Sequence, residues 1–555
     1  MRARIRNYRC LDDVTVKFSN ITTLIGPNGA GKSSILRALE WFFNGKSSDL
    51  TEDDVRVGAT QREITVEVDF DELTPEDRAA LGSARGARVS IGRSWDGGSD
   101  RMWMTVPGSL AFAHIREPGL TAMDKRERYS RLRTEQPEYE LPSARSSAEV
   151  DQNLLAWEDT HPDLLEDQDV PCPALFGFGG QAKLSGLFDY VFVSADLRAA
   201  DEARDVRSSI VGRILEQAID RSDAESDLAE LGRYMADQHA EIQTRYFARQ
   251  LGELSRKMSD AVAELTRGRK ITVEPVLPEF KPPPIQFTVK VADGPAATRV
   301  DQQGHGFRRA LLISALQLLA QATAASGNRQ ICLAIEEPEL FQHPVQARAF
   351  ASVLRKLGAD PGPGVQITYA THSPFFLEAE GFPEIRRVAR HQGDRRVAIW
   401  STTLRAVTDR LAGTVRPENV GKQLSGVLLD RLPEAVFASA VILTEGGSDG
   451  ALLEGCALRG ESLDVRGIVA VEAGSKESIP IAHAILSELG IPGYVMFDAD
   501  AGAGDRAAAK GGSREQAELS STCANRRLLG YLGATVEDHP ATRRRGPSTA
   551  TTPGP

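Results

Sequence analysis

The chain has 555 residues, too many for one ordinary domain, and 41% of them are apolar, enough to form several buried cores. Its formal net charge of −11 makes the surface as a whole repel polyanions, so any contact with DNA must come from local basic patches. Five scattered cysteines argue against a disulfide scaffold or a zinc site. No segment has the apolar core of a signal peptide or of a bilayer span, so we expect a cytoplasmic protein with no membrane partner.

The first predicted elements are short strands at residues 3–8, 14–18 and 21–25, followed by helical periodicity over residues 33–43. Between the third strand and the helix, residues 26–33 read Gly-Pro-Asn-Gly-Ala-Gly-Lys-Ser and fit the P-loop pattern. Lys32 is expected to reach the β- and γ-phosphates of ATP, and Ser33 to ligate Mg²⁺. A chance glycine turn is the alternative, and the flanking strand and helix argue against it. The residues assigned to nucleotide binding here are Gly26, Asn28, Gly29, Gly31, Lys32, Ser33 and Ser34.

Residues 65–70 alternate like a strand, but residues 82–189 are rich in Gly, Ser, Arg and Pro and are weakly patterned. We expect irregular insertion and loop there, with a buried strand at 190–194. Residues 208–267 differ, because apolar side chains recur at helical spacing and charges fill the other faces. This pattern predicts a run of amphipathic helices. Periodicity does not separate plain helical core from a dimerisation arm, so both interpretations stay open.

An apolar strand at residues 331–335 ends in two acids, Glu336 and Glu337. One acid at such a strand end can hold Mg²⁺ or its water, and the next can polarise an attacking water. We therefore assign Glu336 to metal binding and Glu337 to catalysis. Two acids after an apolar strand usually only mark the end of that strand. Together with the P-loop, they indicate a nucleotide-hydrolysing site.

Two other features fit the same nucleotide site. A strand at residues 367–371 leads into His372, which can sense the γ-phosphate when its strand lies beside the acidic one. Gly304 and Gly306 precede a predicted helix at 310–320, so they can offer backbone N–H groups to a phosphate, in that case from a second subunit. A lone histidine is more often structural, and a glycine turn alone is a weak signal.

After a low-signal linker at 404–434, a second α/β unit runs to about residue 532. A strand ends in Glu445, a glycine turn and Asp449, and a later strand ends in Asp498-Ala-Asp500. Clustered carboxylates repel one another unless cations neutralise them, and oxygen ligands favour Mg²⁺ or Mn²⁺. Two such ions can drive phosphodiester cleavage. We assign metal binding to Glu445, Asp449, Asp498 and Asp500 and catalysis to Glu445, Asp498 and Asp500; solvated acids at strand ends are the alternative.

The P-loop, the Glu336-Glu337-Pro-Glu strand end, His372 and the Gly304 turn, in their chain order, resemble the ABC-type ATPase heads of the SMC and DNA-repair class. Here Glu336 stands where that class usually has Asp. Glu445 with Asp498-x-Asp500 resembles a Toprim domain. A head followed by Toprim resembles the OLD (overcoming lysogenisation defect) family of ATP-dependent endonucleases and is similar to the nuclease subunit of the Gabija anti-phage system.

The resemblance implies an α/β fold: an ABC-type P-loop ATPase head with an inserted helical dimerisation region, then a C-terminal Toprim domain. The implied segments are ATPase at 1–205 and 271–403, helical insertion at 206–270, linker at 404–434, Toprim at 435–540 and a disordered tail at 541–555. It also implies ATP, Mg²⁺ or Mn²⁺, double-stranded DNA, a homodimer or higher oligomer, a helicase-like partner protein and a role in phage defence.

An SMC-like DNA-binding ATPase whose Toprim domain does not cut is the alternative function. The family usually continues past Asp-x-Asp with further acids and a basic residue, whereas here the sequence passes into a Pro/Thr-rich tail that looks truncated. A primase or topoisomerase is a weaker interpretation, since no tyrosine stands in a recognisable nucleophile setting. Arg386, Arg387 and Arg390 could contact DNA phosphates or could form a solvated face.

Overall fold

The computed structural model covers the whole chain and forms two compact units. One joins Met1–Asp196 to Thr323–Pro555, and the other is Leu197–Ala322. The structure describes the chain except for residues 82–87, 118–119, 172–187, 196–218, 220, 267, 277–281, 284, 288, 295, 305, 308–309, 312–313, 316–317, 319–329, 341, 360–364, 379–380, 392, 417–419, 421–431 and 541–555.

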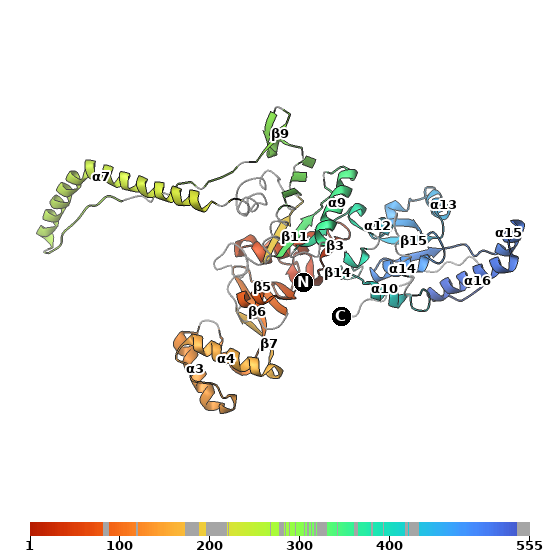
Figure 1. The fold of residues 1–555 in the computed structure, drawn as a ribbon, viewed down its shortest axis with the longest axis horizontal. Coiled ribbons are helices and arrows are strands. Elements are labelled where there is room, and N and C mark those ends of the chain that lie inside the picture. The colour runs from red at the N-terminus through yellow and green to blue at the C-terminus, as the bar shows by residue number, and fades with distance from the viewer. Residues whose placement is uncertain are drawn as a thin grey trace. The chain divides into compact units, whose positions relative to one another are not determined.

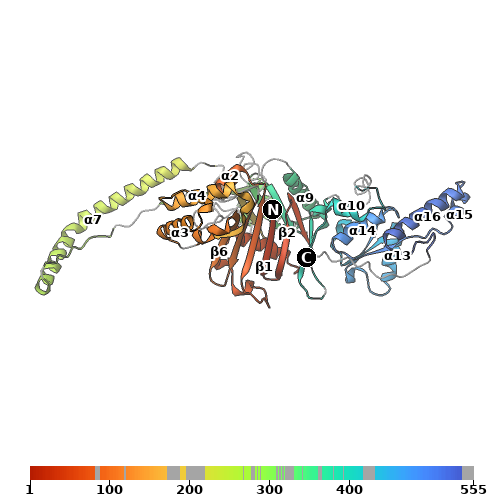
Figure 2. The same ribbon diagram turned by 90° about the horizontal axis from the view of Figure 1, so that it is seen from below.

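The first sheet of the larger unit is antiparallel and six-stranded (Figure 1; Figure 2). Its order is β2-β1-β4-β5-β6-β7. The strands are β1 (Arg2–Tyr8), β2 (Leu11–Lys17), β4 (Ile64–Asp71), β5 (Arg88–Trp95), β6 (Asp100–Gly108) and β7 (Glu166–Pro171). One face is buried because apolar residues alternate along the strands, as in β2, where Leu11, Val14 and Val16 point into the core.

The second sheet is mostly parallel, in the order β14-β13-β3-β12-β11-β8. Its strands are β3 (Ile21–Ile25), β8 (Phe188–Val193), β11 (Gln330–Glu336), β12 (Val365–Ala370), β13 (Ile385–Arg390) and β14 (Val397–Trp400), the last antiparallel to β13. Helix α1 (Lys32–Asn44) packs against strands of both sheets, and its buried Leu39, Phe42 and Phe43 belong to one core with them. Helix α9 (Pro344–Ala359) packs on β12 and β3.

Residues 82–189 were expected to be irregular, and that prediction was wrong for the described part. They include β5, β6 and β7 and the helices α3 (Ala122–Glu135) and α4 (Ser147–Thr160), after α2 (Pro75–Leu81). Buried polar residues hide the strand alternation: Arg93 on β5 is buried, yet donates to the carbonyls of Trp41 (2.6 Å) and Gly45 (3.0 Å). The two helices have their own small core around Phe112, Tyr129 and Leu154.

The C-terminal segment contains a three-stranded parallel sheet in the order β16-β15-β17. Its strands are β15 (Ala440–Thr444), β16 (Ile468–Glu472) and β17 (Gly493–Met496). Its helices are α13 (Gly447–Ala457), α14 (Ile479–Glu488), α15 (Ala503–Ala509) and α16 (Arg514–Tyr531). Helix α14 is almost wholly buried and forms the centre of a core with Val441 and Leu443 of β15.

The start of the predicted linker is ordered and packed. Residues 404–434 include α10 (Leu404–Arg410) and part of α12 (Leu432–Ala435), and Val407 and Leu411 are fully buried against the C-terminal core. Arg410 also pairs with Glu488 at 2.9 Å. This part of the segment is therefore not a loose connection. The tail predicted to be disordered, 541–555, lies outside the described residues.

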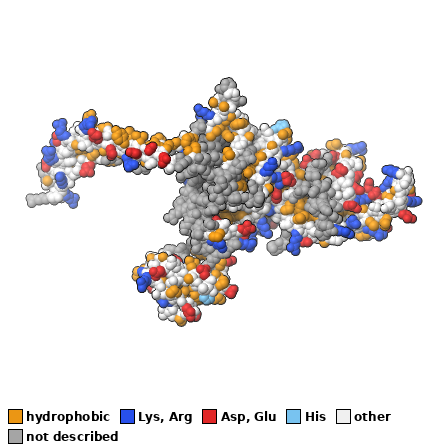
Figure 3. Space-filling view, viewed as in Figure 1, with side chains coloured by type: hydrophobic (Ala, Val, Ile, Leu, Met, Phe, Trp, Pro, Cys, Tyr) orange, Lys and Arg blue, Asp and Glu red, His pale blue; other side chains and the backbone are white. Residues whose placement is uncertain are grey.

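In the smaller unit, a single helix, α7 (Ser222–Leu265), replaces the predicted run of helices over the described part of residues 208–267. No proline interrupts its 44 residues, so the helical hydrogen-bond ladder continues throughout. Large apolar side chains remain exposed on it, and Figure 3 shows them along its length; among them are Leu231, Tyr234, Ile242, Tyr246 and Leu254. A hairpin of β9 (Lys290–Asp293) and β10 (Ala296–Arg299) follows. Among the described helices, none has the length and hydropathy needed to cross a membrane.

Candidate functional site

The P-loop joins β3 to α1, at the carboxyl-end edge of the parallel strands. Gly26, Gly29 and Gly31 have φ angles of 140°, 70° and 117°, which L side chains rarely adopt. A Cβ on Gly26 would lie 1.9 Å from the carbonyl oxygen of Val388, so the loop needs glycine there for space as well. Asn28 and Gly29 are exposed at the loop tip, as is Ser33 at the start of α1, while Ser34 is half-buried. The loop is therefore shaped to present backbone N–H groups at a helix N-terminus.

Lys32 is folded back into the loop. Its Nζ donates to the carbonyl oxygens of Gly26 (2.8 Å) and Pro27 (3.1 Å), and the side chain is buried. Burial lowers the pKa of Lys32 to about 8, although the charges of Glu337 and Glu339 act to raise it. These two acids thus lie close enough to influence the P-loop lysine, as the sequence interpretation requires of Glu337.

The two acids after β11 have different surroundings. Glu336 is buried, and its Oε2 accepts from Arg37 of α1 (3.4 Å) and from the backbone N–H of Ala195 (3.2 Å). Glu337 is half-buried with a left-handed φ of 43°, and its N–H donates to the Ala370 carbonyl at 2.8 Å. Such a conformation costs a non-glycine residue about 1–3 kcal/mol and persists only where the surroundings impose it. The position of Glu337 is therefore fixed by strand β12, which lies between β11 and the P-loop strand.

Glu339, which carried no role in the sequence interpretation, anchors the histidine loop. Its carboxylate accepts from the Thr371 hydroxyl (2.8 Å) and from the backbone N–H of His372 (2.7 Å). Burial lowers the pKa of His372, and the charge of Lys32 lowers it further. The structure therefore brings Lys32, Glu337, Glu339 and His372 together. The signal for Glu339 was its place in Glu-Glu-Pro-Glu, three residues after the strand end.

Other predicted residues are not joined to this group. Gly304 and Gly306 belong to the smaller unit, so their relation to a nucleotide stays a prediction. The suggestion that Arg386 and Arg387 contact DNA is wrong: both are buried, Arg386 donating to the Lys17 carbonyl at 2.7 Å and Arg387 to the Gly490 carbonyl at 3.0 Å. Strands that are buried on both faces place such long side chains in the interior. Arg390 donates to the P-loop carbonyl of Gly29 at 2.8 Å.

The second predicted site lies at the carboxyl-end edge of the β16-β15-β17 sheet. The central strand β15 ends just before Glu445, and the Oε2 of Glu445 accepts from the backbone N–H of Asp498 at 3.3 Å. Asp449, in the first turn of α13, accepts from the Gly446 N–H at 3.3 Å. Burial raises the pKa of Glu445; Lys476 lowers it, and Asp500 and Asp498 raise it. Glu445 and Asp498, which the sequence placed at one edge, are therefore in contact there through the backbone N–H of Asp498.

Lys476 is the residue that sequence reasoning passed over. It follows β16 through a turn at Gly474, and its ammonium contacts the Oδ2 of Asp500 and lies 3.9 Å from the Oε2 of Glu445. Asp500 has a left-handed φ of 56°, and its Oδ1 accepts from Arg506 at 2.8 Å. The only signal in the sequence was a lysine two residues after Gly474, in the turn that follows β16.

Asn525 of α16 also contributes to this edge. It is fully buried, and its Nδ2 donates to the carbonyls of Ala499 (2.8 Å) and Asp538 (2.7 Å). His539 also contacts the Ala499 carbonyl, at 3.0 Å. Helix α16 and the residues that follow it therefore hold the Asp498–Asp500 turn in place.

The acids at this edge fit Mg²⁺ or Mn²⁺ by their chemistry, because the carboxylates of Glu445, Asp449 and Asp498 are hard oxygen donors on adjacent elements. Among the residues that the structure describes, however, no three His, Cys, Asp or Glu side chains converge closely enough to hold a metal ion. The metal and catalytic roles of Glu336, Glu337, His372, Glu445, Asp449, Asp498 and Asp500 stay predictions.

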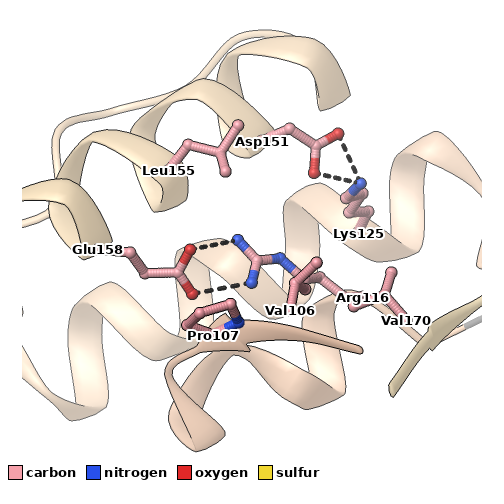
Figure 4. A pocket seen from close by; sticks show the side chains of 8 residues that line it. All are labelled: Val106, Pro107, Arg116, Lys125, Asp151, Leu155, Glu158 and Val170. Carbon is pink, nitrogen blue, oxygen red and sulfur yellow. Dashed lines mark hydrogen bonds and ion pairs between the residues drawn. The ribbon is translucent and has the colours of Figure 1, made fainter. Parts of the chain in front are cut away.

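A cavity of about 250 Å³ lies away from both sites, beside β6, β7 and the α3–α4 pair (Figure 4). Its charged residues are paired across it. Arg116 donates to both oxygens of Glu158, at 2.8 and 2.9 Å, and Lys125 donates to Asp151 at 2.7 Å. These ion pairs tie α4 to its neighbours, and the cavity offers no reactive group.

Comparison with known protein families identifies an N-terminal and a C-terminal domain. Residues 1–377 match the model of the AAA ATPase domain family, and residues 436–500 match the Toprim domain of Overcoming lysogenization defect protein-like proteins. The chain belongs to the OLD family. Its fold is the predicted one: an α/β ATPase head, a long inserted helix and a C-terminal Toprim domain.

Two curated OLD proteins are similar over nearly the whole chain. The OLD nuclease of Thermus scotoductus is 23% identical over 510 residues, which cover 90% of this chain and 81% of the relative. The Old nuclease of Escherichia phage P2 is 21% identical over 510 residues, covering 89% of this chain and 76% of the relative. These are distant similarities, and they extend across the ATPase and Toprim domains together.

Two SMC heads are among the similar solved structures. One, bound to the C-winged helix domain of ScpA, is 13% identical with a TM-score of 0.36 and covers 73% of this chain and 98% of its own. The SMC head domain from Thermotoga maritima is 12% identical with a TM-score of 0.29. The aligned part covers 72% of this chain and 98% of the SMC head domain. At such low TM-scores the similarity indicates nothing about function.

Proposed function

We propose that this OLD-family protein is an ATP-hydrolysing, metal-dependent DNA endonuclease. The observation that carries the proposal is the presence, in one chain, of two acidic strand edges. One joins Glu337 and His372 to the P-loop lysine, and the other joins Glu445 to Asp498. The names of the two OLD relatives, both nucleases, support the second activity.

At the first site the chain's own groups suit ATP hydrolysis. Lys32 binds the β- and γ-phosphates, with Ser33 and Glu336 holding Mg²⁺, and Glu337 accepts a proton from the attacking water. Glu339 fixes the backbone of the loop that carries His372 by accepting from the Thr371 hydroxyl and from the His372 N–H, and His372 then senses the γ-phosphate. Glu337→Gln keeps the shape of the side chain but removes its basicity. We expect it to bind ATP as well as the wild type and to lower the hydrolysis rate at least 100-fold.

At the second site, Glu445, Asp449 and Asp498 would be the residues to hold Mg²⁺ or Mn²⁺, and such an ion would supply activation of a water and charge stabilisation of the leaving oxygen of a phosphodiester. Asn525 holds the Ala499 carbonyl, so the aspartates on either side keep their positions. ATP binding or turnover then gates access of double-stranded DNA to this edge. The test is incubation of supercoiled plasmid with the purified chain and Mg²⁺ or Mn²⁺. Glu445→Ala must abolish nicking while ATP hydrolysis continues.

A second function, an SMC-like DNA-binding ATPase without cleavage, is favoured by two observations. No three candidate ligands converge among the described residues, and Asp500 is already paired with two basic side chains. Steady ATP hydrolysis and DNA binding, with intact plasmid under every divalent ion, would select this function over the first.

We also propose a homodimer joined through α7. Monomeric proteins rarely expose long apolar patches, and Tyr234, Ile242 and Tyr246 are each at least half exposed on this helix. Sedimentation of Ile242→Asp, compared with a change at the polar Glu241, tests it: the first should be monomeric and the second dimeric. A role in phage defence and a helicase-like partner protein complete the proposal, supported by the resemblance to the Gabija nuclease subunit.

A further inference from the structure

The segment that follows Asp500 is basic, in a chain that is acidic overall. Residues 501–514 contain Arg506, Lys510 and Arg514 but a single acid, Asp505, whereas the whole chain has a formal net charge of −11. All three basic residues are exposed, and Asp505 pairs with Arg514 at 2.9 Å. In a chain of this charge, attraction to a polyanion has to come from such a local excess of positive charge.

This basic segment is joined directly to the acidic edge of the Toprim domain. Arg506 of α15 donates to the Oδ1 of Asp500 at 2.8 Å and to the carbonyl of Ala501 at 3.1 Å. Its side chain is still 58% exposed. Lys510 follows one helical turn later, about 6 Å further along the helix axis. Among the described residues, no acid forms an ion pair with Lys510, so its charge is available to a partner in solution.

The residues between the three basic side chains are small, and their backbone is held in place. Residues 507–509 are alanines, and residues 511–513 are Gly, Gly and Ser, so none of the six adds bulk or negative charge beside Lys510. The N–H of Gly512 donates to the Ala507 carbonyl at 2.9 Å, and Gly511 has a left-handed φ of 78°. The turn therefore fixes the backbone of Lys510 at the end of α15 and leaves room for a phosphate backbone to approach.

We infer that residues 503–514 contact the phosphate backbone of double-stranded DNA, and that Lys510 neutralises a phosphate close to the acidic edge. This inference rests on the proposed endonuclease function and gives it a DNA-binding surface, which the buried Arg386 and Arg387 do not supply. The carboxylates of the edge repel phosphates, so a duplex has to be held there by neighbouring cations. Phosphate contacts orient a duplex without reading its bases, so binding through this surface is independent of sequence.

The test measures binding of the full-length chain to a labelled DNA duplex by fluorescence anisotropy, with EDTA present, at salt concentrations from about 50 to 200 mM. Each phosphate contact contributes about −0.9 to the slope of log K against log salt concentration. Lys510→Ala should therefore reduce the size of the slope by about 0.9 and weaken binding about five- to tenfold near 0.1 M salt. Lys510→Arg keeps the charge and should bind like the wild type.

The matched control is Arg459→Ala, which removes an exposed charge between α13 and β16, at the opposite edge of the same sheet. It should leave the slope and the affinity unchanged. No loss in Lys510→Ala, or an equal loss in Arg459→Ala, would overturn the inference; if the wild type still nicks plasmid, the proposed function stands. Binding that depends on Lys510 without nicking under any divalent ion would support the surface and refute cleavage. A wild type that neither binds the duplex nor nicks plasmid would refute both.

Discussion

The carboxylate of Glu339 accepts hydrogen bonds from both the hydroxyl of Thr371 and the backbone N–H of His372, so one side chain fixes the loop that carries the histidine. Glu339→Ala removes both bonds, each worth about 1.5–3 kcal/mol because the acceptor is charged. We expect the ATP hydrolysis rate to fall about 10- to 100-fold with little change in ATP affinity. Rate and affinity measured on the same preparation check this. The control is Glu378→Ala, which removes an exposed acid paired with Arg355. Equal losses in the two variants would contradict a specific role for Glu339.

The buried state of Lys32 predicts a pH dependence for ATP binding. Burial lowers the pKa of Lys32 to about 8, and the phosphates need the charged form. Below pH 8 the lysine is already protonated; above it, ATP must bind together with a proton, so affinity should fall as pH rises from 8 to 9. Calorimetry in buffers of different ionisation enthalpy would show proton uptake in that range. Lys32→Arg stays charged, so its ATP affinity should not fall between pH 8 and 9. An equal fall in both proteins would show that another group causes the pH dependence.

The hydrogen bonds of Asn525 predict that helix α16 supports the acidic edge that carries Glu445 and Asp498. Asn525 is fully buried, and Asn525→Ala removes its hydrogen bonds to the carbonyls of Ala499 and Asp538, each worth about 0.5–1.5 kcal/mol. We expect a lower thermal transition and at least a tenfold weaker affinity for Mn²⁺. Arg526→Ala, which breaks an exposed ion pair with the same Asp538, should change neither property measurably. Unchanged Mn²⁺ affinity in Asn525→Ala would show that the Asp498–Asp500 turn keeps its conformation without Asn525.

His483 predicts that the Toprim domain loses stability in mild acid. Burial and, to a smaller extent, the charge of Arg410 lower the pKa of His483 to about 4. An unfolded histidine titrates near 6.5, so between pH 6.5 and 4 the unfolded state binds the extra proton and stability falls as pH falls. The loss is about 2 kcal/mol between pH 6.5 and 5. Thermal unfolding of the wild type and of His483→Gln at both pH values measures it. The variant should lack this part of the pH dependence; parallel losses would exclude His483 as its source.

From the sequence, we could predict the residues of each site that lie at the ends of strands. The P-loop, Glu336-Glu337, His372, Glu445 and the Asp498–Asp500 turn could be predicted, because the carboxyl ends of parallel strands share one edge. The residues that pair with these site residues could not be predicted from the sequence. Lys476 and Glu339 act on residues 24 and 33 positions away, and only the order of the strands brings them together.

Two of the wrong predictions, the irregular region at 82–189 and the DNA contacts of Arg386 and Arg387, have a common cause, which is polar side chains placed in the interior. Arg93 and Arg386 are buried because backbone carbonyls satisfy their guanidinium groups, and a reading based on hydrophobic alternation cannot anticipate such partners. The 44-residue helix α7 was predicted as several helices, because its apolar spacing drifts around the helix and its end signals are weak.

The central claim, that the Toprim edge cleaves DNA, is tested most directly by plasmid nicking with Asp498→Asn. This variant keeps the size of the side chain and removes one carboxylate charge beside Glu445. The control is Asp464→Asn in the same domain, an exposed aspartate that precedes β16 at the opposite end of the strand. With Mn²⁺ and ATP, the account predicts nicking by the wild type and Asp464→Asn, and at least a 100-fold slower rate for Asp498→Asn at an unchanged ATP hydrolysis rate. Equal nicking by all three proteins would contradict it.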